Sequence, residues 1–130
     1  MTEAQADVLD EIINRLQAVV PPRVSLVRAD GVVQINVDGA FWAKIGVEHF
    51  LQRQSPSELA ALAQQLASAV QDIIAESSGE PWPGRLSVGS RDLALPFASV
   101  DRGVLTMWFG SEDERVLACG PLTLENREAV

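Results

Sequence analysis

Apolar residues recur every three or four positions over two long stretches of the chain, and each stretch has signals at its ends. The first stretch covers about residues 3–19 and places its apolar side chains on one helix face. Thr2 and Gln5 have the spacing of a capping box before it. Pro21-Pro22 ends it, because proline lacks the amide donor and disfavours helical geometry in the residue before it. The pattern predicts an amphipathic first helix.

The start and end signals of a second predicted helix are stronger than those of the first. Ser55-Pro56-Ser57-Glu58 supplies a capping serine, a proline at the first helical position and a glutamate three residues after the cap. The apolar stripe that follows consists of Leu59, Leu62, Leu66, Val70 and Ile73, and Ser77-Ser78-Gly79 ends the run. Alanines beside the stripe allow close approach, so we expect this helix to pack on a sheet and on another helix at once.

Between the two helices the apolar period falls to two, which is typical of strands that are buried on one face. Asp30-Gly31 and Asp38-Gly39 suit two-residue hairpin turns, because the central positions of such turns need positive φ. They separate three predicted strands, 23–28, 32–37 and 41 to about 48. The alternation predicts an antiparallel meander with helices on one face. In the third strand we expect inward Phe41, Ala43, Ile45 and Val47, and outward Trp42, Lys44 and Glu48.

After residue 79 the pattern becomes β-like again, beyond the turn-rich Pro81-Trp82-Pro83-Gly84. Short strands are predicted at 86–88 and 93–95, a strand pair at 104–109 and 115–119 around the loop 111–114, and a weakly helical tail from Leu122. The predicted fold class is therefore α+β. We expect one domain over residues 1–130, with an α-β-β-β-α core at 1–79 and a C-terminal β extension at 80–130.

The net charge and the composition of the chain limit the kinds of partner that we expect it to bind. The net charge is −8, from 18 acidic and 10 basic residues, and it disfavours non-specific binding to phosphate backbones. No run of 18 apolar residues is present, and the N-terminus lacks the pattern of a signal peptide. We therefore expect a cytoplasmic protein without a membrane partner.

Residues that carry chemistry are few. The single histidine, His49, and the single cysteine, Cys119, are far apart in the sequence, and Cys119 follows an apolar run that favours a buried structural role. Glu112-Asp113-Glu114 lacks the ligand spacing of a calcium loop. We expect a non-enzymatic protein with no metal, cofactor or small-molecule substrate.

The outward face of the predicted meander is the best candidate for a binding site. The candidate residues are Arg23, Arg28, Gln34, Asn36, Trp42 and Lys44, beside Ser25 and Glu48. Trp42 could anchor a partner there, since tryptophan is enriched at binding hot spots. The alternative is that the C-terminal segment, with Trp82, Trp108 and Phe109, folds over this face and buries Trp42.

The region from 3 to 78 resembles the YbaB/EbfC nucleoid-associated protein family. The resemblance rests on Gly31-Val32-Val33-Gln34-Ile35-Asn36-Val37-Asp38-Gly39-Ala40 and on the helix that opens at Ser55-Pro56-Ser57-Glu58. It implies a small homodimer, built through the sheet and the helices, that binds DNA with little sequence preference.

Two other binding functions stay open. The full order of elements, the length and the acidic charge are similar to those of the small dimeric chaperones of type III secretion, which hold a segment of an effector protein. An immunity-type inhibitor, whose acidic surface meets a basic toxin, is the third alternative.

Overall fold

The computed structural model describes residues 3–29, 31–47, 55–80, 82–83, 94–111 and 113–124. The elements are α1 (Glu3–Gln17), β1 (Val24–Ala29), β2 (Val32–Val37), β3 (Ala40–Gly46), α3 (Pro56–Ser78), β4 (Pro96–Asp101), β5 (Val104–Gly110), β6 (Arg115–Ala118) and β7 (Leu122–Thr123). The predicted α+β class is confirmed, in the predicted order of helix, meander, long helix and further strands.

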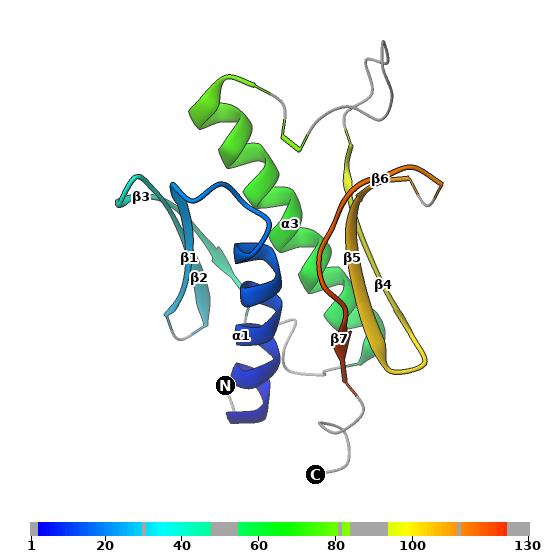
Figure 1. The fold of residues 1–130 in the computed structure, drawn as a ribbon. Coiled ribbons are helices and arrows are strands. Elements are labelled where there is room, and N and C mark those ends of the chain that lie inside the picture. Colours follow the sequence, from blue (N-terminus) through cyan, green and yellow to red (C-terminus); the bar gives the residue numbers. More distant parts are fainter. Residues whose placement is uncertain are drawn as a thin grey trace.

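Two antiparallel sheets enclose a layer of helices (Figure 1). The first sheet has the order β1-β2-β3, and the second has the order β4-β5-β6 with β7 paired to β5. Helix α1 packs on β1, and α3 packs on β4 and β5. The C-terminal strands therefore lie across the helices from the meander. The alternative in which they cover its outer face is wrong.

The core forms between the three layers. Val33 and Ile35 of the first sheet, Leu62 of α3 and Leu105 of the second sheet are fully buried and belong to one apolar cluster. This burial follows from the predicted apolar stripes of the helices and from the alternation in β2.

The meander has the predicted hairpins. Ala29 pairs with Val32 across the first turn, and the Asp30 of that turn lies outside the described residues. In the second turn Asp38 and Gly39 both have positive φ, at 52° and 81°. Such dihedrals match the right-handed twist of the flanking strands.

The predicted caps of α3 are present. The backbone N–H of Glu58 donates to the Oγ of Ser55 (3.2 Å), and Pro56 occupies the first turn. At the other end Gly79 has a φ of 75°, and its N–H donates to the carbonyl of Ala75 (2.8 Å). This geometry favours glycine, because a side chain is strained at positive φ.

Helix α1 ends at Gln17, two residues before the predicted end, and Gln17 then bonds to the neighbouring sheet. Its Nε2 donates to the carbonyl of Val24 (2.8 Å), and the N–H of Leu26 donates to its Oε1 (2.8 Å). The side chain of Gln17 thus forms hydrogen bonds with backbone groups on the edge of β1 that faces away from β2.

The second sheet differs more from expectation. Strand β4 begins at Pro96, whereas Ala94 and Leu95 of the predicted strand 93–95 are irregular. The predicted strand 86–88 lies outside the described residues. Leu122 pairs with Leu105 in β7, so the predicted helical tail is wrong at its start. The predicted pairing of β5 with β6 is confirmed.

Candidate functional site: the outer face of the first sheet

A bulge in β3 decides what the outer face of the first sheet exposes. Ile35 of β2 pairs with Ala43, but the next residue, Asn36, pairs with Phe41. Trp42 is therefore the extra residue, and two positions of β3 stand opposite one position of β2. This places the consecutive side chains of Phe41 and Trp42 on the same face of the sheet.

Both aromatic side chains are accessible. Phe41 is 60% exposed and Trp42 is 44% exposed, and Val27 of β1 adds a 44% exposed side chain to the same face. The prediction that Phe41 faces the core is wrong, because the bulge shifts the alternation by one residue. Ala43 and Ile45 keep their predicted contact with the core, and Val47 is fully buried.

The two arginines predicted for this face point elsewhere. Arg28 pairs in register with the buried Val33, and its Nε lies 2.6 Å from the Oδ1 of Asp10 on α1. The Nη2 of Arg23 donates to the Oγ of Ser77 near the end of α3 (3.2 Å). These two guanidinium groups link the sheet to the helices, so the expected basic cluster is not brought together.

Three of the predicted polar residues do share the outer face. Gln34 pairs with Lys44, and Asn36 pairs with Phe41, so their side chains lie on the side away from the helices. Gln34 and Asn36 are half-buried, and Lys44 is exposed. Glu48, also predicted to be outward, lies outside the described residues. The described part of the face is aromatic and nearly neutral.

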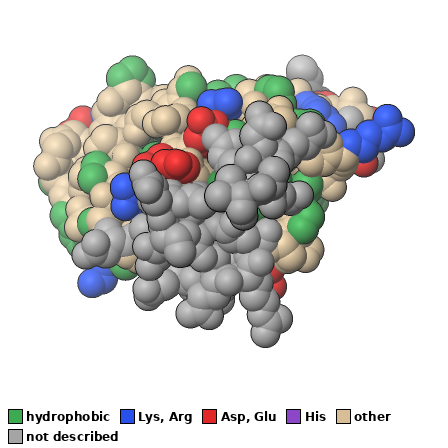
Figure 2. Space-filling model, turned by 90° about the horizontal axis from the view of Figure 1, so that it is seen from below, with side chains coloured by type: hydrophobic (Ala, Val, Ile, Leu, Met, Phe, Trp, Pro, Cys, Tyr) green, Lys and Arg blue, Asp and Glu red, His purple; other side chains and the backbone are tan. Residues whose placement is uncertain are grey.

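The described Lys and Arg residues do not form a continuous patch on the side seen from below. There (Figure 2) the blue side chains stand as separate spots among neutral and acidic ones. A phosphate backbone needs several cations in line, because each contact contributes through the release of condensed counterions.

A second aromatic cluster lies on the outer face of the second sheet. Phe97 pairs with Trp108, their ring centroids are 6.1 Å apart, and the guanidinium carbon of Arg115 lies 4.2 Å from the Trp108 ring centroid. A hollow of about 380 Å³ beside it is lined by Phe97, Ser99, Trp108 and Ser111. Phe97 was not predicted as a candidate, although the alternation of Pro96, Ala98 and Val100 against Phe97 and Ser99 is a strand signal.

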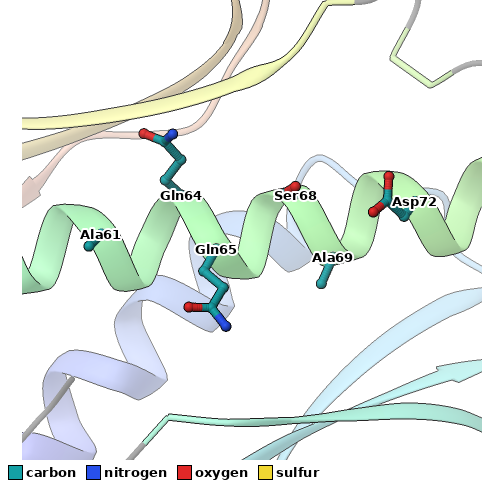
Figure 3. Close-up of a pocket in the computed structure, with 6 residues that line it drawn as sticks. All are labelled: Ala61, Gln64, Gln65, Ser68, Ala69 and Asp72. Atoms are coloured by element: carbon teal, nitrogen blue, oxygen red, sulfur yellow. The ribbon is translucent and has the colours of Figure 1, made fainter. Parts of the chain in front are cut away.

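A hollow of about 540 Å³ lies over the side of α3 that faces away from α1 (Figure 3). It is lined by Ala61, Gln64, Gln65, Ser68, Ala69 and Asp72. Gln65 points toward β3 and Gln64 points toward β4, so the open side of α3 lies between the two sheets (Figure 3). The sequence pattern predicted no role for these residues.

Among the described residues no group of three His, Cys, Asp or Glu side chains could hold a metal ion. Cys119 is buried as predicted, and this burial raises the pKa of its thiol to about 11. His49 lies outside the described residues.

No protein-family model, curated protein or solved structure matches the chain. None of the described helices is long and apolar enough to cross a membrane.

Proposed function

We propose that the chain is a non-enzymatic protein-binding module that recognises a polypeptide partner through the outer face of the first sheet. The observation that carries this proposal is the pair of adjacent, exposed aromatic side chains at Phe41 and Trp42. Tryptophan and other aromatic residues supply much of the binding energy of protein interfaces, because they bury a large apolar area with little loss of side-chain entropy.

The charges of this face favour a protein over DNA. Arg23 and Arg28 contact Ser77 and Asp10, which leaves Lys44 as the cation of the predicted set that lies on the face itself. Binding to a phosphate backbone depends on several Lys or Arg contacts and weakens steeply with salt. The apolar pair beside Lys44 instead matches the aromatic centre and polar rim of a protein interface.

DNA binding, which the family resemblance implies, is the second candidate function. In that case the partner at this face would be a nucleic acid instead of a polypeptide. A photocrosslinking amino acid, benzoylphenylalanine, at position 42 distinguishes the two in living cells of the source organism. The control is the same amino acid at position 14, where Asn14 is exposed on α1.

We expect a crosslinked product at position 42 that protease destroys and nuclease leaves intact, with a mass that shows a polypeptide other than a second copy of the chain. Phe41→Ala should reduce its yield, and position 14 should give none of it. A nuclease-sensitive product, or equal products at positions 42 and 14, would contradict the proposal.

A further inference from the structure

We infer that the hollow on the outer face of the second sheet is a binding site for a small aromatic carboxylate. The ring of the ligand lies against Phe97, and its carboxylate accepts hydrogen bonds from the indole of Trp108 and the guanidinium of Arg115. The second sheet lies across the helices from the first (Figure 1), so this site does not depend on the proposed function.

The indole N–H of Trp108 is the observation that points to a ligand. Trp108 lines the hollow, although the residue as a whole is only 7% exposed. Its Nε1 is shielded from solvent and has no hydrogen-bond acceptor in the described part of the chain. A buried donor without an acceptor costs free energy, and few such groups occur in folded proteins. A ligand that brings an acceptor oxygen into the hollow would remove this cost.

A bulge in β6 places a cation beside this donor. Leu117 pairs with the inward Phe109, but Arg115 pairs with Gly110, so the residue between Arg115 and Leu117 is extra. If β6 alternated regularly, Arg115 would share the inner face with Leu117. The bulge places Arg115 on the outer face, where its guanidinium carbon lies 4.2 Å from the centroid of the Trp108 ring.

The guanidinium of Arg115 is available to a ligand. Arg15 and Arg28 form ion pairs with Glu11 and Asp10, whereas Arg115 forms none within the residues that the structure describes. Its contact with the Trp108 ring holds the guanidinium through its face and leaves the N–H groups at its rim free. A planar guanidinium binds a carboxylate through two parallel N–H groups, which makes this pairing both strong and directional.

The polar groups around the hollow determine the charge of the ligand. Indole and guanidinium groups donate hydrogen bonds and cannot accept them, so the ligand must supply the acceptors. Ser99 and Ser111 add hydroxyl groups, and none of the four residues that line the hollow is acidic, although the chain has 18 acidic residues. A cationic ligand is therefore excluded by Arg115. A carboxylate matches the single charge of Arg115, whereas a phosphate group carries a charge of about −1.5 to −2 at pH 7.

Phe97 and the size of the hollow determine the body of the ligand. Phe97 is 42% exposed on the edge strand β4, so its ring offers a face to a second ring and can turn to let the ligand reach Trp108. Ligand pockets have volumes of roughly 300–1,000 Å³, and a cavity of about 150 Å³ admits benzene. The hollow of about 380 Å³ thus has room for one aromatic ring with a short acidic group.

Nuclear magnetic resonance of the indole N–H groups tests the site in the full chain, with phenylacetate as the probe. The chain has three tryptophans, whose indole signals are assigned with Trp42→Phe and Trp82→Phe. We expect phenylacetate to move the Trp108 signal downfield in a saturable way, because its N–H gains an acceptor. The other two signals should stay in place. No saturable shift at Trp108, or equal shifts of all three signals, would overturn the inference.

Three further ligands test the chemical class. 2-Phenylethanol keeps the ring without the charge and should bind about tenfold more weakly than phenylacetate. Cyclohexylacetate keeps the charge without the aromatic ring and should bind about fivefold more weakly. Equal affinity for these two analogues and phenylacetate, or tighter binding of uridine monophosphate, would show that the site does not select an aromatic carboxylate.

Two variants and a matched control test the place of the site. Arg115→Gln should raise the dissociation constant of phenylacetate about tenfold. Arg102→Gln removes the same charge from an exposed position between β4 and β5 and should leave the constant unchanged. Ser99→Leu fills the hollow and should abolish binding while Arg115 and Trp108 remain. Equal constants in the two arginine variants, or undiminished binding to Ser99→Leu, would overturn the inference.

Discussion

Residue by residue, the first sheet shows how one inserted position changes the chemistry of a surface. If β3 had no bulge at Trp42 and alternated regularly, Phe41 would fall on the same side as Ala43 and Ile45 and would face the core. With it, two aromatic side chains are exposed where strict alternation allows one. The arginines show the reverse effect, since Arg28 forms an ion pair with Asp10 on α1 instead of adding a charge to the outer face of the sheet.

Cys119 carries a prediction about pH. Burial raises the pKa of its thiol to about 11, above its ordinary value of 9.0, so the folded state keeps the thiol neutral where the unfolded chain ionises. The neutral thiol therefore stabilises the folded state fully below about pH 9. This stabilisation is lost as the pH rises toward 11, because the unfolded chain gains free energy from ionising the thiol.

Urea unfolding at pH 7 and pH 10 checks this prediction. We expect the free energy of unfolding to fall more between these two values for the natural chain than for Cys119→Ala. An equal fall in both proteins would show that the thiol has no part in the alkaline loss of stability.

At the level of elements, the end of β5 depends on a glycine. Gly110 has a φ of 118°, and a Cβ atom at this position would collide with the carbonyl oxygen of Glu114. Gly46 in β3 has open space around the same position and no positive φ.

We expect Gly110→Ala to reduce the free energy of unfolding by about 2 kcal/mol or more, through backbone strain and the collision. Gly46→Ala should change it by less than about 0.5 kcal/mol. Chemical denaturation of the two variants measures both values, and similar losses in the two would refute the contrast.

Elements with local signals were predictable from the sequence. Ser55 and Gly79 mark the ends of α3, and the Asp-Gly dipeptides mark the turns of the meander, because each acts on its own backbone. The bulge depends on how β3 pairs with β2, which no local pattern shows. Strand β4 was missed: the sequence pattern predicted a strand at 93–95, whereas β4 begins only at Pro96.

The candidate site was predicted only in part, for the same physical reason. Trp42, Lys44, Gln34 and Asn36 do share the outer face, because strand alternation is local. The orientations of the Arg23 and Arg28 side chains depend on their hydrogen-bond partners in α3 and α1, respectively. The contacts of such long side chains are fixed only when the helices have packed against the sheet.

For the whole molecule, the arrangement of layers explains which surfaces are left for binding. The two helices fill the space between the sheets, so the outer face of each sheet and the open side of α3 meet solvent in the described part of the chain (Figure 1). The outer faces of the two sheets carry exposed aromatic side chains, Phe41 and Trp42 on the first and Phe97 on the second, whereas the hollow over α3 is lined by small and polar residues.

The central claim is that the outer face of the first sheet binds a polypeptide through its aromatic pair. Its most direct test is the yield of an in-cell photocrosslink from benzoylphenylalanine at position 27, where Val27 lies on the same face but outside the bulge. The yield is compared in three backgrounds: the natural sequence, Trp42→Ala and Lys44→Glu. We predict that Trp42→Ala lowers the yield at least fivefold and that Lys44→Glu changes it less than twofold. Loss of the crosslink in Lys44→Glu, with full yield in Trp42→Ala, would contradict this claim and indicate a contact with phosphate.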